Sequence, residues 1–341
     1  MQPVKVNQPN KNWQPVQHPF VRDATLQEAL HSKGYAVLPW IDAETVAKLK
    51  TLYHQLHTLA PEKGGMFYSL YSRDLEYRET VHEKIGALLQ PVLEQHFAGY
   101  KNVINSFIIK SPGPESEFYV HQDTTGLDEF QHSALSLWIP MQDVTPENGA
   151  LALVEKTHWL LSPHRGASFA FGFEQIQTTV REYLKPITMK AGEVLLFDSR
   201  LIHHSSTNTT TTDRVALVCG LFPEAAKFQT CWKDKNNPEA PIELFEHPDD
   251  YLLKYPHFFY NCHDRPVTGA KVGEVPHDFP QLSEEQFREF CQNNGVEAVK
   301  EVKAPAPQPT NIVAEPDGIN RFEEPTVVAE KRGLWARLMG R

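Results

Sequence analysis

The stretch from residue 102 to 223 constrains the fold most, because it is a succession of short strand-like runs. These runs are rich in β-branched residues or alternate between apolar and polar residues, and they comprise residues 103–110, 118–123, 133–140, 150–154, 193–197 and 215–222. Turn sequences containing Pro and Gly, such as residues 111–114 and 146–149, separate them. Many short strands joined by turns are typical of a sandwich or jelly roll. We therefore predict a mainly β fold with flanking helices.

Capping residues predict where the flanking helices begin. Asp23 precedes a helical stretch over residues 24–32, and Asp42 precedes a second stretch with apolar residues at helical spacing. A third helix is predicted over residues 73–97, and Ser283 begins a fourth that runs through residue 293. Beyond Trp232, up to that fourth helix, we expect mostly loops.

Composition divides the chain into four parts. We expect residues 1–20 to be a flexible leader, residues 21–295 to form one catalytic domain, and residues 296–330 to be a Pro-rich linker. Residues 331–341 are basic and amphipathic, so we expect them to contact the domain, a partner or a membrane surface.

Charge and cysteine content exclude several classes of protein. With 33 Lys and Arg against 43 Asp and Glu, the net charge of −10 argues against a nucleic-acid partner. The four cysteines show no metal-binding or disulfide spacing, which favours free thiols in a reducing compartment. No secretory signal or membrane-length apolar run is visible. We expect a cytoplasmic protein without a transmembrane segment.

The run at residues 118–123 ends in His121-Gln122-Asp123, which contains two candidate metal ligands. Side chains two residues apart on a strand share a face, so His121 and Asp123 would converge on one point. A third ligand would come from His203 or His204, which follow the run at residues 193–197. Two histidines and one carboxylate suit a non-haem Fe(II) oxygenase.

A His-x-Asp triplet alone is weak evidence, because the chain contains a second one. His247-Pro248-Asp249 lies in a polar, turn-like setting, and proline cannot donate to a strand ladder. We therefore assign the metal site to His121 and Asp123.

Taken together, these motifs resemble the phytanoyl-CoA dioxygenase family of Fe(II)- and 2-oxoglutarate-dependent oxygenases. The resemblance covers roughly residues 33–222. Its motifs are the opening at residues 34–39, the His121-Gln122-Asp123 triplet, the strand pair from Trp138 to Leu151, and residues 191–197, which lead to His203. Ser205, Asn208 and Arg214 then follow at the family's offsets. One departure is Glu155-Lys156-Thr157-His158, where the family usually has Gly-Ser-His.

The resemblance implies a double-stranded β-helix, or cupin-like jelly roll, with a metal at one mouth. It implies His121, Asp123 and His203 as Fe(II) ligands, and 2-oxoglutarate and O2 as cosubstrates. His204 is the rival for the third position, but on a strand it would point to the opposite face. In halogenating relatives Gly or Ala stands at the carboxylate position, so Asp123 favours hydroxylation.

The remaining predicted site residues concern the keto acid. The always-charged guanidinium of Arg214 suits the remote carboxylate of 2-oxoglutarate, with Ser205 beside it. We expect Trp138 to form a wall of this slot, and Lys110, Asn105 or Gln122 to reach the keto acid or the substrate. The expected reaction is hydroxylation of an unactivated C–H of a small-molecule or carrier-linked substrate, with release of succinate and CO2.

Two other functions fit parts of the pattern. A metal-binding β-barrel without turnover could serve as a sensor or scaffold, although an intact triad and Arg214 count against it. A zinc hydrolase could also use His, His and Asp to activate water, but it would have no obvious use for Arg214.

Two substitutions distinguish the triplets. Asp123→Ala should abolish succinate formation coupled to product, because it removes a proposed metal ligand. His247→Ala should leave activity nearly intact. Iron content and succinate release measure both, and loss of iron in His247→Ala would show that the wrong triplet had been chosen.

Overall fold

A computed structural model describes residues 20–57, 65–160, 164–255, 263–277 and 281–299. The predicted leader, linker and C-terminal segment lie outside these residues, apart from Phe20 and residues 296–299. The strands are β1 Tyr35–Leu38, β2 Met66–Tyr68, β3 Tyr100–Lys110, β4 Phe118–His121, β5 Leu135–Pro140, β6 Leu151–Leu153, β7 Lys185–Pro186, β8 Val194–Asp198, β9 His203–Ser205, β10 Arg214–Pro223, β11 Phe228–Trp232, β12 Ile242–His247 and β13 Ala270–Val275. The helices are α1 Ala24–Lys33, α2 Ala43–Leu56, α3 Leu75–His96, α4 Gln177–Arg181, α5 Tyr251–Lys254 and α6 Glu284–Asn293.

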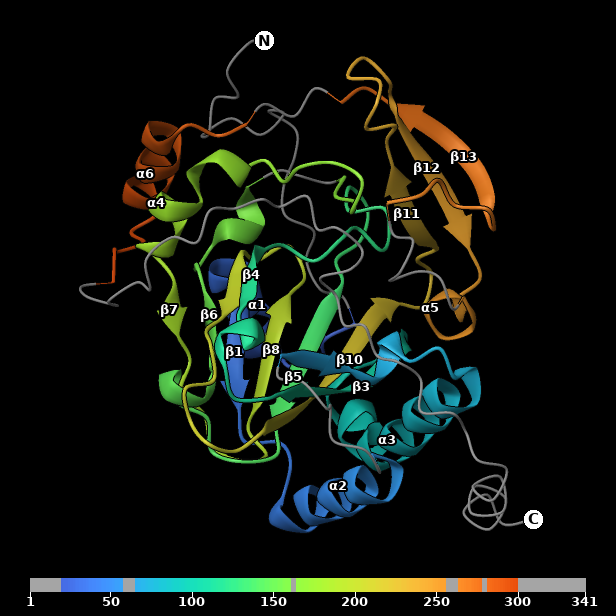
Figure 1. Cartoon of the computed structure of the whole chain (residues 1–341), viewed down its shortest axis with the longest axis vertical. Helices are drawn as coiled ribbons and strands as arrows, with labels where there is room; N and C mark the ends of the chain where they lie inside the picture. Colours follow the sequence, from blue (N-terminus) through green and yellow to red (C-terminus); the bar gives the residue numbers. More distant parts are fainter. Residues whose placement is uncertain (1–19, 58–64, 161–163, 256–262, 278–280, 300–341) are drawn as a thin grey trace. The chain divides into compact units, whose positions relative to one another are not determined.

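Two antiparallel sheets form the core (Figure 1). The major sheet has the order β1-β8-β5-β10-β3-β2, and the minor sheet has the order β4-β9-β6-β7. In the major sheet, the long central strand β10 pairs with both β3 and β5, so that Leu217 lies between Phe107 and Ile139. This arrangement confirms the prediction of a mainly β jelly roll with flanking helices, in its double-stranded β-helix form.

The two faces of the major sheet have different neighbours. Residues directly opposite each other on paired strands share a face, so Trp138 on β5 points the same way as Val218 on β10 and Leu195 on β8. Trp138 and Leu195 belong to the apolar cluster between the sheets. Phe107 points the other way, and its ring lies 5.4 Å from that of Tyr53 on α2. Helices α2 and α3 therefore cover the outer face (Figure 1).

The helices begin and end where their capping residues predict. The side chain of Asp23 accepts a hydrogen bond from the backbone N–H of Leu26 at 2.8 Å, and α1 ends at Gly34, whose φ of 89° is left-handed. Asp42 caps α2 in the same way through the N–H of Thr45. These caps fix the two helices that precede β1 and β2.

The outer face of the minor sheet is also covered. Val120, Ala152 and Ile202 form one buried apolar cluster with Val180 of α4 and Phe287 of α6. The segment that contains Phe173, Ile176 and Val180 thus packs on the back of this sheet, away from its inner face.

A third sheet, β11-β12-β13, lies to one side of the core (Figure 1). The expectation of loops beyond Trp232 was therefore wrong, since β12 and β13 pair with each other. His247 ends β12, where its Nε2 lies 2.8 Å from the hydroxyl of Thr230 and its ring stacks on Tyr251. This packing explains its burial without a metal.

Two strands at the edges of different sheets face each other across a seam. β2 is the last strand of the major sheet and β4 the first of the minor sheet. The rings of Tyr68 and Phe118 lie 6.0 Å apart across this seam. Side-chain contact, rather than a strand ladder, therefore joins the sheets here.

Within the described ranges, the helices are all too short or too polar to span a bilayer. Three of the cysteines, Cys219, Cys231 and Cys291, are buried free thiols, as predicted. Cys262 lies outside the described residues.

Removal of the Phe107 side chain should destabilise the fold strongly. Phe107 is fully buried between the major sheet and α2, so Phe107→Ala should lower the free energy of unfolding by about 3–5 kcal/mol. Val272→Ala is the control, because Val272 is 46% exposed on β13, and its effect should stay within about 0.5 kcal/mol. Urea denaturation measures both, and similar losses would contradict the assignment of the core.

Candidate metal centre

His121, Asp123 and His203 converge at one end of the β4–β9 ladder. His121 on β4 lies directly opposite His203 on β9 in the antiparallel ladder. One ligand atom from each of the three residues lies within 4.8 Å of the other two. The Oδ1 atom of Asp123 is 3.8 Å from Nε2 of His121 and 3.7 Å from Nε2 of His203. Three donor atoms at these separations can share one metal ion.

Both imidazoles are oriented by the backbone. Nδ1 of His121 lies 2.9 Å from the carbonyl oxygen of Tyr119, and Nδ1 of His203 lies 2.9 Å from that of Leu201. A carbonyl oxygen can only accept, so each Nδ1 carries the proton and each Nε2 offers a lone pair. Such a second hydrogen bond is what orients histidine ligands in metal sites.

The electrostatics of His121 favour the neutral, ligating form. Burial lowers its pKa well below the ordinary value, and the neighbouring His203 lowers it further. At neutral pH the imidazole of His121 is therefore unprotonated on Nε2. A metal ion would not have to displace a proton there.

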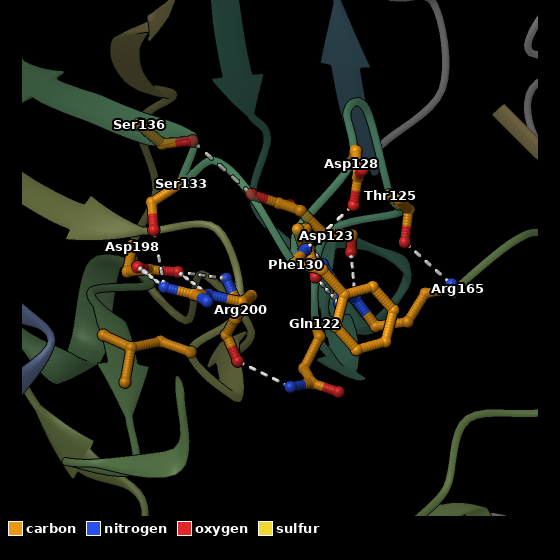
Figure 2. A network of polar contacts seen from close by, with 12 residues as sticks. Gln122, Asp123, Thr125, Asp128, Phe130, Ser133, Ser136, Arg165, Asp198 and Arg200 are labelled. Carbon is orange, nitrogen blue, oxygen red and sulfur yellow. Dashed lines mark hydrogen bonds and ion pairs between the residues drawn. The ribbon is translucent and has the colours of Figure 1, made fainter. Parts of the chain in front are cut away.

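Asp123 is held by its backbone more than by its side chain. Its N–H donates to the carbonyl of Ser199 at 3.1 Å. Its carboxylate, 36% exposed, accepts one long hydrogen bond of 3.4 Å from the hydroxyl of Ser136 (Figure 2). The carboxylate thus retains lone pairs for a metal.

His204, the rival ligand, lies on the opposite face of β9. It pairs with Ala152, which belongs to the outer cluster. Its Nε2 is 3.1 Å from Oε1 of Glu117 and 3.2 Å from Nη1 of Arg181. The hydrogen bond with His204 is the largest cause that lowers the pKa of Glu117 to about 2. Alternation along β9 thus separates the two adjacent histidines.

Arg214 is buried inside the jelly roll without a partner for two of its nitrogens. It is 1% exposed, and Nε and Nη1 have no hydrogen-bond partner among the described residues. Its guanidinium lies 5.0 Å from the ring centre of Trp138. Burial lowers its pKa to about 10, so it remains charged at neutral pH. A buried charge with free donors is costly unless an anion meets it.

Lys110 lies opposite Arg214 in the ladder, but its ammonium group is occupied. It donates to the backbone carbonyls of Ser116, Ser205 and Ser206. Burial lowers its pKa to about 6, whereas three acceptors at one nitrogen favour the protonated form. Lys110 therefore ties β3 to the segments around β4 and β9.

The other predicted keto-acid residues are distributed over different surroundings. Ser205 faces the interior and donates to the carbonyl of Gly149 at 3.0 Å. Gln122 donates to the carbonyl of Arg200 at 2.6 Å (Figure 2), and Asn105 donates to the carbonyl of His82 on α3 at 3.0 Å. Thus Arg214, Trp138, Lys110 and Ser205 line the interior, whereas Asn105 faces a helix. Gln122 ties β4 to the segment before β9.

Sequence reasoning missed Tyr68, which is close enough to both Asp123 and Arg214 for their charges to act on its hydroxyl. Burial raises its pKa; the Asp123 carboxylate adds to this effect, while the Arg214 guanidinium opposes it. Tyr68 pairs with Ile108 and shares its interior face. It lies on a three-residue strand, which is too short for a periodic signal.

The family assignment follows from a comparison of sequences. The sequence model described as "Phytanoyl-CoA dioxygenase (PhyH)" matches residues 24–216, which is more than half of the chain. The chain belongs to the phytanoyl-CoA dioxygenase family. This confirms the resemblance inferred from the motifs, and the matched range contains all of the residues discussed for the site.

Curated relatives are distant members of this family. A phytanoyl-CoA dioxygenase domain-containing protein 1 homolog from Dictyostelium discoideum is 26% identical over 172 residues, which cover 48% of this chain and 55% of that protein. Phytanoyl-CoA dioxygenase domain-containing protein 1 from Mus musculus is 25% identical over 203 residues, covering 53% and 66%. The chain thus spans about half the length of the first of these relatives.

Solved structures with some similarity include two other proteins. The epimerase SnoN, in complex with Fe3+, alpha ketoglutarate and nogalamycin RO, has a TM-score of 0.45 at 20% identity, covering 75% of this chain and 96% of SnoN. HygX from Streptomyces hygroscopicus, with nickel and 2-oxoglutarate bound, has a TM-score of 0.44 at 16% identity, covering 62% and 90%.

The two adjacent histidines provide a matched pair of variants. His203→Ala should lower the affinity for a divalent metal by at least about 100-fold, because one of three ligands is lost. His204→Ala should leave metal affinity within about threefold, since His204 faces Glu117 and Arg181. Calorimetric titration with Ni(II) measures both, and the reverse result would assign the third ligand to His204.

Proposed function

We propose that this chain is an Fe(II)- and 2-oxoglutarate-dependent dioxygenase that hydroxylates an unactivated C–H of a small-molecule or carrier-linked substrate. The observation that carries this proposal is the buried guanidinium of Arg214, with free donors, in the same interior as the three-residue cluster. Family membership agrees with it.

The residues of the cluster fit Fe(II). Two neutral imidazoles and one carboxylate from one side would leave open positions on the metal, which is the ligand set of non-haem iron oxygenases. With 2-oxoglutarate and dioxygen, the bound iron would supply the oxidant, with succinate and CO2 as by-products. The backbone carbonyls of Tyr119 and Leu201 hold both rings ready for that metal.

The interior also fits a keto-diacid. A guanidinium binds a carboxylate through two parallel hydrogen bonds, and the low dielectric constant of a buried site strengthens their attraction. Trp138 lies against the guanidinium and would form one wall of the slot. Tyr68, which is near both Arg214 and Asp123, would line the path from the remote carboxylate to the metal. Asp123 itself occupies the carboxylate position, which favours hydroxylation over halogenation.

Aromatic rings lead outward from the cluster and support an apolar substrate part. The ring of Tyr119, which is 45% exposed, lies 5.1 Å from that of His121 and 6.5 Å from that of Phe171. Phe171 lines a surface hollow together with Phe169 and Arg165. A substrate placed against Tyr119 would meet a stacking surface beside a proposed metal ligand.

Two alternatives make different use of the same residues. A zinc hydrolase would need the three ligands but no buried Arg214, and a sensor without turnover would bind metal and keto acid without consuming the latter. An anaerobic titration separates them. A visible charge-transfer band that requires both Fe(II) and 2-oxoglutarate supports the oxygenase, and retained zinc without a band supports the hydrolase.

Arg214→Met tests the carboxylate slot. Loss of a charge-assisted hydrogen-bond pair should raise the concentration of 2-oxoglutarate that half-saturates the band by about 100-fold, while Fe(II) affinity stays within about threefold. Arg181→Met is the control, because Arg181 pairs with Glu117 on the outer face. Equal 2-oxoglutarate affinities in both variants would remove Arg214 from the site.

A further inference from the structure

A buried ion pair lies beside Asp123 and has no part in the proposed reaction so far. Arg165 forms a two-point contact with Glu129, with Nη1 to Oε2 and Nη2 to Oε1 both at 2.6 Å. The two side chains are only 1% and 2% exposed. Charge-assisted bonds of this geometry fix both partners rigidly.

The remaining nitrogen of the same guanidinium, Nε, contacts the backbone of the proposed metal ligand Asp123. Nε of Arg165 donates to the backbone carbonyl of Asp123 at 2.7 Å. The backbone N–H of Arg165 also donates to the hydroxyl of Thr125, at 2.8 Å, and the N–H of Thr125 donates to the carbonyl of Arg165. Figure 2 shows Arg165 joined to Asp123 and Thr125 in this way. The chain immediately after the ligand is therefore clamped.

We propose that Arg165 is a positioning residue that sets the direction of the Asp123 carboxylate toward the two histidines. The side chain of Asp123 is itself weakly restrained, because its bond to Ser136 is 3.4 Å long and the carboxylate is 36% exposed. Arg165 fixes the backbone carbonyl of Asp123, and Ser199 fixes its backbone N–H. The position of the Asp123 carboxylate oxygen therefore depends on these two backbone bonds. Glu129 in turn fixes Arg165. The inference rests on the metal site of the proposed function, but not on 2-oxoglutarate.

Removing one member of a buried ion pair can unfold a protein, so the test uses variants that leave no charge alone. In the double variant Arg165→Met with Glu129→Leu, apolar side chains of similar size replace both charges, and such replacements are often tolerated. In Arg165→Lys an ammonium group remains for Glu129, but it cannot also supply the bond from Nε to the Asp123 carbonyl. The control is Arg288→Met, because Arg288 makes a two-point contact with Glu182 at an exposed site.

The measurement is calorimetric titration of the full chain with Ni(II) in the absence of 2-oxoglutarate, together with thermal unfolding of the metal-free protein. We expect metal affinity to fall about 10- to 100-fold in the double variant and in Arg165→Lys, while Arg288→Met binds like the unaltered protein. The midpoint of unfolding of Arg165→Lys should stay within a few degrees.

A purely structural role gives a different result. Metal affinity equal to that of the unaltered protein in folded Arg165→Lys would overturn the proposal, as would an equal loss in Arg288→Met. The charge-transfer band of the unaltered protein tests the oxygenase separately, so failure of one proposal is distinguishable from failure of the other.

Discussion

The pairing of β4 with β9 is the constraint on which the site depends. It places His121 opposite His203, and a slip by one residue would turn one imidazole to the outer face. The ladder is irregular between Phe118 and His121, so regular pairing alone does not hold the register. The bond from Gln122 to Arg200 and the bond from Asp123 to Ser199 hold the same two segments together.

The buried charges of the core fall into two groups. Arg165 and Arg200 are each matched by a carboxylate, Glu129 and Asp198, and Lys110 is satisfied by carbonyls. Arg214 differs, because among the described residues no carboxylate pairs with it, and its Nε and Nη1 have no hydrogen-bond partner. The buried charge of Arg214 is therefore balanced by no anion among the described residues, which sets it apart from the other two arginines.

Strand alternation and helix-capping residues predicted those features of the fold that depend on residues close together in the sequence. Alternation separated His203 from His204, and capping residues located the helices. His121 and Asp123 do lie close together, but not on one strand face as expected, because β4 ends at His121 and Asp123 follows it. Asn105 shows the limit, because β3 is buried on both faces and its pattern does not reveal which residues point inward. The clamp of Arg165 on Glu129 joins residues 36 apart through two loops, and no periodic signal marks it. Tyr68 was missed for the same reason, on a strand of three residues.

The seam between β2 and β4 has a mechanical consequence. Hydrogen-bonded ladders resist stretching because many bonds must break together, but across this seam the rings of Tyr68 and Phe118 contact each other instead. Phe118 also packs edge-on against His121, at 4.6 Å. Ring contacts are less directional than ladder hydrogen bonds, so strand pairing does not fix the distance between β2 and β4.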